Sequence, residues 1–329
     1  MARSRRKRGP LRRLILALVL LAAILVAVPL AMWHGPGPLE EDAAVQIPDG
    51  ASVGSAARLL EEKGVIRSAA WFRRLAARLG SSDPIRAGEF GFPAGVSAAG
   101  VLDIMQHGRP VQRFVVIPEG MPSILVHERL MAEKLLIGTA PVPPEGSVLP
   151  DSYSYERGES RAAVLKRMQA AMTETLAALW KTRKPGIAVS TPREAVTLAS
   201  IVEKETGVPA ERRMVAGVYT NRLKRGMPLQ ADPTVIYPVT RGKPLGRRIK
   251  RSELTARNGY NTYAMPGLPQ GPIANPGRAS IAAVLDPEAT RAIYFVADGS
   301  GGHVFADTLE QHNANVQKWY ALRRARGEM

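Results

Sequence analysis

A run of twenty residues without a charged side chain, residues 14–33, is the feature that most constrains how this chain folds. As a helix it would rise about 1.5 Å per residue and span about 30 Å, the thickness of the hydrocarbon core of a bilayer. Seven basic residues and no acidic residue precede the run, whereas Glu40, Glu41 and Asp42 follow it. This asymmetry predicts one membrane-spanning helix whose N-terminus lies in the cytoplasm.

The residues around the end of this run favour an anchor that is kept. Trp33 stands where an aromatic ring is typical of the membrane–water interface. A cleaved signal peptide is the alternative, but its apolar core is usually shorter, and His-Gly-Pro-Gly-Pro follows here in place of a small-residue cleavage site. We therefore expect a cytoplasmic basic segment over residues 1–13, the helix over 14–33 and a linker over 34–44.

Composition excludes several kinds of site. The chain of 329 residues contains no cysteine, which excludes disulfides, thiol catalysis and cysteine-ligated metals. The five histidines are not closely paired and no H-E-x-x-H motif is present, so we expect neither a metal nor another cofactor.

The positive charge narrows the choice of partner. The formal net charge is +16, and the seven basic residues before the apolar run leave +9 for the rest of the chain. This balance suits an anionic membrane surface or an anionic wall polymer, and it equally suits a merely soluble basic surface. We expect no nucleic acid partner, because no binding motif is recognisable and few aromatic residues are interspersed with the basic ones.

Apolar periodicity and turn residues predict an α+β chain. Residues 45–112 form a small α/β module in this prediction, with helices over residues 55–63, 71–79 and 98–106 and a strand over residues 88–92. A Pro-x-Gly turn precedes a predicted helix three times, at Pro48, Pro93 and Pro118, and this use of turns loosely resembles modules of the LysM type. A larger mixed α/β domain over residues 113–329 is expected to contain a long helix over residues 160–181.

Two glutamates lie near the end of a helix with clear start and stop signals. Thr191 is the expected N-cap, Pro192 takes the first helical position, and Gly207 follows the end of the helix at Thr206. At about 100° per residue, Glu203 and Glu205 fall on opposite margins of the buried arc.

Either glutamate is a candidate general acid. A carboxyl group at the edge of an apolar face is partly desolvated, which favours its neutral form. Glu203 and Glu205 both meet this condition, so helix geometry does not choose between them. In the alternative interpretation, either one simply pairs with Arg212, Arg213 or another base, and on this reasoning alone that structural role is the more common outcome.

Three later segments combine amides, hydroxyls and tyrosine rings with many prolines and glycines: residues 228–237, 260–263 and 267–277. The first of them is expected to be extended. Planar hydrogen-bonding groups suit the hydroxyl and acetamido groups of a sugar, and aromatic rings suit its apolar faces. Ordinary turn chemistry is the alternative, because the same residue types dominate turns.

Read together, ten strings resemble the endolytic murein transglycosylase family, also called YceG-like. They are residues 198–206 (LASIVEKET), 221–223, 229–237 (LQADPTVIY), 260–263 (YNTY), 267–269, 276–277 and 294–299 (YFVADG), with 145–146 and 150–153 (EG, PDSY) upstream and 301–305 (GGHVF) near the end. The resemblance covers nearly the whole chain. Gln270 and Ser152 depart from it, because a second proline and a threonine are common there.

The resemblance implies a single N-terminal transmembrane helix, a small LysM-like α/β module and a larger mixed α/β catalytic domain. It implies a lytic transglycosylase that cleaves the β-1,4 bond between N-acetylmuramic acid and N-acetylglucosamine in nascent peptidoglycan. The products would carry 1,6-anhydro ends, and the cut would terminate strand elongation. The catalytic glutamate of the family is the first of its Glu-Lys-Glu pair, which selects Glu203 over Glu205.

The sugar-orienting residues are candidates by resemblance and by their chemistry: Asn221, Gln230, Asp232, Tyr260, Asn261, Thr262 and Tyr263. Asp232, which precedes a proline, is alternatively a turn-capping residue.

The expected partners are peptidoglycan glycan strands, the peptidoglycan synthesis machinery and the inner membrane, with the catalytic domain in the periplasm. Two alternatives stay open. One is a hydrolytic muramidase in which Glu203 and Asp232 act as a pair with water as the nucleophile. The other is a non-catalytic peptidoglycan-binding scaffold.

Overall fold

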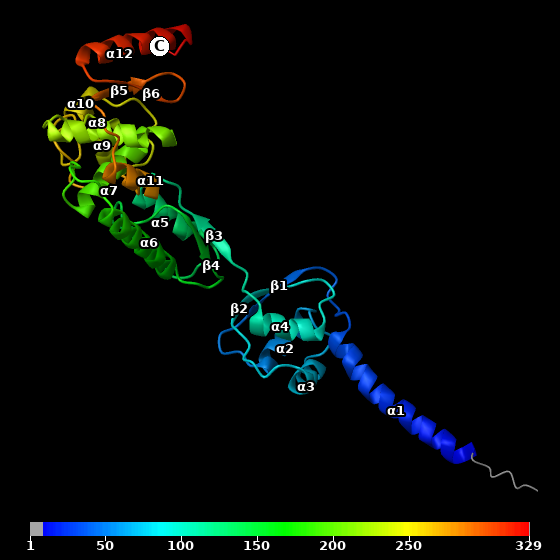
Figure 1. Cartoon of the computed structure of the whole chain (residues 1–329). Coiled ribbons are helices and arrows are strands. Elements are labelled where there is room, and N and C mark those ends of the chain that lie inside the picture. The colour runs from blue at the N-terminus through cyan, green and yellow to red at the C-terminus, as the bar shows by residue number, and fades with distance from the viewer. Residues whose placement is uncertain (1–8, 329) are drawn as a thin grey trace, which may run out of the picture. The chain divides into compact units, whose positions relative to one another are not determined.

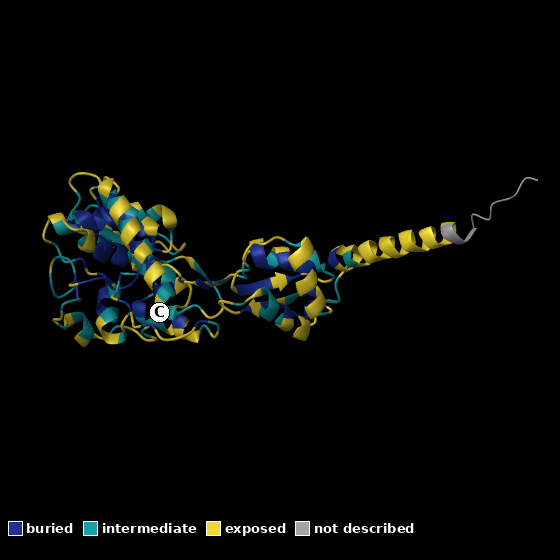
Figure 2. Cartoon of the chain, turned by 90° about the horizontal axis from the view of Figure 1, so that it is seen from below, coloured by how far each residue is buried: buried dark blue, intermediate teal, exposed yellow. Residues whose placement is uncertain are grey.

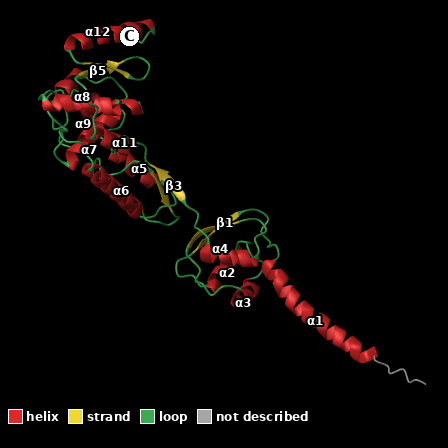
Figure 3. Ribbon diagram, in the orientation of Figure 1, coloured by secondary structure: helices red, strands yellow, loops and turns green. Residues whose placement is uncertain are grey.

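The computed structural model describes residues 9–328 and has a mixed α+β fold, as predicted (Figures 1 and 3). The chain divides into two compact units, of which the first ends at Arg113 and the second begins at Phe114. Arg3, Arg5, Arg6, Lys7 and Arg8 of the predicted basic segment lie outside the described residues.

Helix α1 (Gly9–His34) contains the predicted membrane span. Among the described residues, one helix is long and apolar enough to cross a membrane, and it covers 23 residues, Arg12–His34. Figure 2 shows this helix coloured as exposed along most of its length. A continuous apolar surface of this kind is stable in lipid rather than in water, which supports the prediction of an N-terminal apolar anchor.

The side chain of Trp33, which was predicted to lie at a membrane interface, is buried within the protein. Its side chain is 3% exposed and its ring centroid lies 6.0 Å from that of Phe72, inside the core of the first unit. The last turns of α1 pack on the helices of this unit, so the indole is removed from both water and lipid. Burial against other apolar side chains takes the place of the interface that the sequence indicated.

The first unit consists of a short two-stranded sheet and three helices. Strand β1 (Ala43–Ile47) runs antiparallel to β2 (Gly88–Phe92), with Ala43 opposite Phe92 and Ile47 opposite Gly88. The helices are α2 (Val53–Glu62), α3 (Ala69–Leu79) and α4 (Ala98–His107), which confirms the three predicted helices within two residues at each end. A serine side chain caps the start of each one, at Ser52, Ser68 and Ser97.

The segment between α1 and β1 is bonded to the first unit. The Gly37 N–H donates to Gly95 O at 3.1 Å, and the Gly95 N–H donates to Leu39 O at 2.7 Å. The Ala94 N–H donates to the Asp42 carboxylate at 2.9 Å. These bonds join the residues after the helix to the Pro-Ala-Gly turn.

The second unit is mainly helical. Its elements are β3 (Arg113–Val116), α5 (Ser123–Ala132), β4 (Ser152–Tyr155), α6 (Arg161–Lys181), α7 (Pro192–Glu205), the 3-10 turn η1 (Pro209–Glu211), α8 (Arg212–Lys224), α9 (Asp232–Thr240), α10 (Arg251–Thr255), α11 (Arg278–Leu285), β5 (Tyr294–Ala297), β6 (His303–Ala306) and α12 (Leu309–Ala325). Strand β3 pairs with β4, and β5 forms an antiparallel hairpin with β6. The predicted long helix is confirmed as α6, with Ser160 as its N-cap.

Helix α7 lies at the centre of this unit. Eight consecutive residues, 195–202, are buried, and the helix packs against α6, α8, α9 and α11. The predicted N-cap is confirmed, because the Thr191 side chain accepts from the Glu194 N–H. A central helix held on several sides gives a rigid platform for side chains in its last turn.

The prediction of an extended segment over residues 228–237 is wrong in its second half, where α9 begins at Asp232. Pro233 is compatible with a helix start because proline lacks an N–H, and an N–H in the first turn would have no partner within the helix. Thr234 is fully buried and its hydroxyl donates to Ala231 O at 2.7 Å, which closes the first turn.

Candidate active site

Glu203 lies in the last turn of α7, and its side chain is 4% exposed. The Gly277 N–H donates to Oε2 at 2.8 Å, and Arg212 Nη2 donates to Oε1 at 3.4 Å. Gly277 is the residue before α11 and Arg212 is the first residue of α8. Three segments far apart in the sequence therefore hold this one carboxylate.

Arg212 has a second and shorter contact. Its Nη2 donates to the Glu119 carboxylate at 2.8 Å, and the Glu119 side chain is 44% exposed. Glu119 belongs to the Pro-Glu-Gly turn after β3, and a Cβ built on Gly277 would lie 1.9 Å from its Oε1. The chain at Gly277 therefore passes close to both Glu119 and Glu203, and a larger residue there would require the Glu119 side chain to shift.

A cavity of about 480 Å³ adjoins this cluster. Glu119, Gly120 and Lys204 are among the residues that line it. Glu203 is not in its wall but directly behind it, because a Cβ on Gly120 would lie 3.4 Å from Glu203 Cγ. The carboxyl group is separated from the cavity by the thickness of this turn.

Glu205 lies in different surroundings. Its Oε1 is buried and has no hydrogen-bond partner among the described residues. Burial, and to a smaller extent the negative charge of Asp232, raise the pKa of Glu205 to about 7, although the hydrogen bond to Tyr219 and the positive charge of Arg222 partly offset these two effects. This carboxyl group is therefore neutral in part at neutral pH.

The structure thus separates the two glutamates that helix geometry left equivalent. Glu203 pairs with Arg212, as the alternative interpretation predicted for either glutamate. Arg213, the other predicted partner, contacts Asp286 at 3.2 Å. Glu205 has the neutral character that desolvation predicted.

Glu145 is a third buried carboxyl group, which the sequence marked only as part of the upstream signature. It accepts from the Ser123 N–H at 2.9 Å and from the Tyr237 hydroxyl at 3.1 Å. Burial raises the pKa of Glu145, partly offset by its bonds to Ser123 and Tyr237. The signal that could have identified it is an acidic residue inside a proline-rich, otherwise apolar segment.

Two further cavities meet at Glu145. They measure about 740 and 480 Å³, and Tyr260 lines both. The rings of Tyr260 and Tyr237 lie 4.8 Å apart. Of the predicted sugar-orienting residues, Tyr260 is the one that the structure places in the wall of these cavities.

Three predicted sugar-orienting residues bond instead to the protein. Asn221 donates to Thr290 O at 2.8 Å and to Ala292 O at 3.0 Å. Asn261 is fully buried and donates to three carbonyl groups between residues 253 and 256. The buried Thr262 hydroxyl lies 2.8 Å from that of Thr234. These side chains fix loops rather than line a cavity.

The remaining three lie near Glu205. The Tyr263 hydroxyl donates to the Asp232 carboxylate at 2.6 Å, and Asp232 acts on Glu205 through its charge. Gln230 is exposed, has a left-handed φ of 54°, and accepts from Arg222 at 3.5 Å. The structure therefore gathers Gln230, Asp232 and Tyr263 on the Glu205 side of α7.

Within residues 9–328, no group of three or more histidine or acidic side chains is placed to hold a metal ion. The chemistry available at these sites is that of carboxyl groups, an arginine, hydroxyls and aromatic rings.

Comparison with known proteins identifies the family of this chain. The model of the YceG-like family matches residues 45–318, and the chain belongs to this family.

Two relatives carry the name endolytic murein transglycosylase. The protein from Bacillus subtilis (strain 168) is 28% identical over 318 residues, which are 86% of this chain and 87% of the relative. The protein from Streptococcus pneumoniae serotype 2 is 29% identical over 321 residues, which are 83% of this chain but 57% of that longer relative.

A solved structure has a similar fold. The crystal structure of a YceG-like protein from Listeria monocytogenes has a TM-score of 0.51 and 28% sequence identity. The match covers 84% of this chain and 99% of that one.

Proposed function

We propose that this chain is an endolytic murein transglycosylase, a lyase that cuts glycan strands of peptidoglycan, with Glu203 as its catalytic acid/base. Family membership and the names of the relatives support the activity. The observation that carries the choice of residue is the nearly buried Glu203 carboxylate, held by the Gly277 N–H and by Arg212 beside a cavity.

In the proposed reaction, Glu203 first donates one proton to the substrate and then accepts one proton from it. Protonated Glu203 donates to the glycosidic oxygen between N-acetylmuramic acid and N-acetylglucosamine as that bond breaks through an oxocarbenium-like state. The carboxylate then accepts the proton of the muramoyl 6-hydroxyl while this oxygen bonds to C1. The 1,6-anhydro product forms without water, and Glu203 is protonated again. Because the nucleophile belongs to the substrate, no second carboxylate is needed.

Access to Glu203 requires the turn in front of it to move. Glu119 is the shorter contact of Arg212 and is half exposed, and Gly120 at φ 72° closes the turn. A glycan that enters the neighbouring cavity would displace this turn and release Arg212 from Glu119, which leaves Arg212 to hold the Glu203 carboxyl group. Arg212 is then a positioning residue for Glu203.

Sugar binding is assigned to the cavities around Tyr260 and Tyr237, where two rings and the Glu145 carboxyl group lie together. The rings suit the apolar faces of the pyranoses. Asn261 and Thr262 support this region indirectly, through the loops that they bond, whereas Asn221 holds the segment before β5. Gln230, Asp232 and Tyr263 are proposed to orient sugars from the other side of α7.

The cellular setting of this activity is part of the proposal. Helix α1 would span the inner membrane with its N-terminus in the cytoplasm, and both units would lie in the periplasm. The first unit would act as a LysM-like module. The activity would release new strands near the peptidoglycan synthesis machinery and so terminate their elongation.

Product analysis tests the reaction. Full-length protein in detergent is incubated with uncrosslinked glycan strands, and the fragments are measured by mass spectrometry beside the Glu203→Gln variant. We expect 1,6-anhydro ends from the wild type and not from the variant. Reducing ends would instead support the hydrolytic muramidase, and unchanged strands the non-catalytic scaffold. Glu205→Gln is the matched control, because it changes the same chemical group two residues away.

A further inference from the structure

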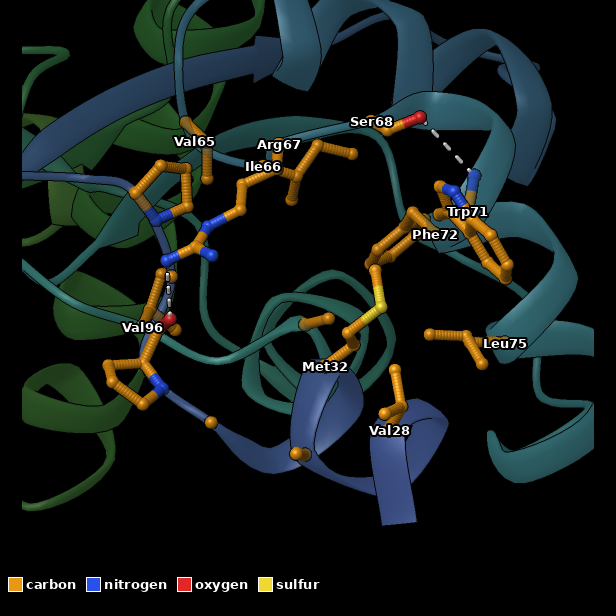
Figure 4. Close-up of a pocket in the computed structure, with 16 residues that line it drawn as sticks. Val28, Met32, Val65, Ile66, Arg67, Ser68, Trp71, Phe72, Leu75 and Val96 are labelled. Atoms are coloured by element: carbon orange, nitrogen blue, oxygen red, sulfur yellow. Dashed lines mark hydrogen bonds between the residues drawn. The ribbon is translucent and has the colours of Figure 1, made fainter. Parts of the chain in front are cut away.

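The first unit contains an apolar cavity of about 360 Å³, and all the residues that line it belong to this unit. Figure 4 shows Met32 of α1 reaching toward Phe72, with Val28 and Leu75 nearby. Trp71 lines the same cavity, yet 47% of its surface is exposed. An exposed tryptophan beside an open apolar cavity indicates a binding surface rather than a packing defect.

One wall of this cavity is the proposed membrane span itself. Val28, Ala31 and Met32 belong to the last two turns of the helix, and all three are exposed. Because Trp33 is buried in the first unit, that unit begins where the span ends. The cavity therefore opens at the depth where acyl chains meet headgroups.

The surroundings of the cavity are basic. Residues 67–80 contain four arginines and no acidic residue. Arg67 lines the cavity and donates to Pro36 O at 3.5 Å, and Arg74 lies over the Trp71 ring with Cζ 5.7 Å from the centroid. Arg78 follows Arg74 by one helical turn. Guanidinium groups form strong, directional hydrogen bonds with phosphate oxygens.

We propose that this cavity binds one acyl chain of an anionic membrane phospholipid, with Arg67 and Arg74 facing its phosphate. The membrane helix supplies the location, the apolar lining suits the chain, and the arginines suit the headgroup. A water-soluble anion would make no contact with the apolar wall of the cavity. A lipid without net charge would gain little from the positive charge of the arginines. The inference rests on the membrane anchoring proposed above.

The binding test uses quenching of tryptophan by brominated lipid. Full-length protein carries Trp180→Phe and Trp319→Phe, so that the signal comes from Trp71, which lines the cavity, and from Trp33, which is buried beside the cavity residue Phe72. It is titrated in detergent with phosphatidylglycerol or phosphatidylcholine brominated on one acyl chain. We expect saturation at one lipid per chain, with phosphatidylglycerol bound about fivefold more tightly for each arginine near the headgroup, because the choline cation of phosphatidylcholine offsets its phosphate charge and phosphatidylglycerol has no such cation. Quenching that does not saturate, or equal affinity for both lipids, would overturn the proposal.

Two pairs of variants separate the cavity from the charge. Ala31→Phe fills the cavity and should abolish saturable quenching, whereas Ala23→Phe makes the same change on the same exposed helix and should preserve it. Reversal of Arg67 and Arg74 to glutamate should remove the preference for phosphatidylglycerol. Reversal of Arg58 and Lys63, which are exposed on or next to α2 and do not line the cavity, should keep it. If the two variants of either pair gave the same quenching result, the proposed lipid site would be contradicted.

Two further measurements distinguish the possible failures. If a polyprenyl phosphate displaces the brominated phospholipid at lower concentration than unlabelled phosphatidylglycerol does, the occupant is not a phospholipid and the proposal is wrong. Alkaline carbonate extraction tests the anchor alone. Release of the chain from membranes would refute the anchoring, whereas retention without saturable quenching would refute only the lipid site. The product analysis of Glu203→Gln is unaffected by either result.

Discussion

The surroundings of Glu203 and Glu205 differ sharply although the two residues share the last turn of α7. Glu203 contacts an arginine and a backbone N–H that come from other elements, and it lies behind the wall of a cavity. Glu205 has an unpartnered buried oxygen and a pKa raised to about 7. The position of a residue on a helix therefore does not decide its chemical role. The elements that pack against that side of the helix decide it.

Two criteria for choosing the catalytic glutamate give different answers. A perturbed pKa selects Glu205 as the acid, because general acids work best with a pKa near the working pH. Contacts, the neighbouring cavity and the family resemblance select Glu203. Buried acids also occur for structural reasons, so we assign chemistry to Glu203 and a pH-dependent structural role to Glu205.

The largest expected effect is that of Glu203→Gln. Loss of the acid/base should lower kcat by about 10³- to 10⁴-fold, whereas Glu205→Gln should lower it by less than about tenfold. Initial rates on defined glycan strands measure both, with thermal unfolding to check that each variant is folded. The reverse order of the two variants would transfer the catalytic role to Glu205.

The next effect concerns stability and pH. The folded-state pKa of Glu205 is raised from 4.5 to about 7, so ionisation above pH 4.5 favours the unfolded chain. Its neutral form stabilises the second unit fully at low pH, and we expect a loss of up to about 3 kcal/mol as the pH rises through 7. Urea unfolding followed by the fluorescence of Trp180 measures this loss. Glu205→Gln should flatten the profile between pH 5 and 8, and an unchanged slope would show that another group titrates.

Arg212→Ala should have an intermediate effect on rate. Without this contact the Glu203 carboxyl group is held only by the Gly277 N–H, so we expect kcat to fall about 10- to 100-fold while KM changes little. Arg213→Ala is the matched control, because Arg213 contacts Asp286 and Glu288. A rise in KM with unchanged kcat would assign Arg212 to substrate binding.

The smallest expected effect is that of Asp232→Asn. The charge of Asp232 is the second cause of the raised pKa of Glu205, so its removal lowers that pKa. The midpoint of the stability change with pH should move to lower pH, measured by the same unfolding experiment. Tyr263→Phe keeps the charge of Asp232 and serves as the control. A midpoint that does not move would assign the shift to burial alone.

Local signals in the sequence predicted the secondary structure well. Thr191 and Pro192 mark the start of α7 because capping is decided within four residues. The start of α9 at Asp232 was missed because a proline after an acidic residue is compatible with both a turn and a helix start.

The candidate site could be predicted only in part, because its contacts are long-range. Gly277 is 74 residues from Glu203, and no periodicity indicates that its N–H reaches that carboxylate. Asn221 and Asn261 were predicted to orient sugars from their chemistry, but an amide suits a backbone carbonyl equally well. Glu145 was missed as a site residue because its partners, Ser123 and Tyr237, are distant in sequence.

The burial of Trp33 joins the end of the apolar helix α1 to the core of the first unit. A fragment that begins at Gly35 would lack an indole that fills the core beside Phe72. Loss of a large buried ring typically costs about 3 to 5 kcal/mol, a large share of the stability of a small unit. Removing the membrane helix to obtain a soluble protein would thus leave a hole in the interior and a tendency to aggregate. For this molecule, solubilisation with the helix intact is the sounder route to a native preparation.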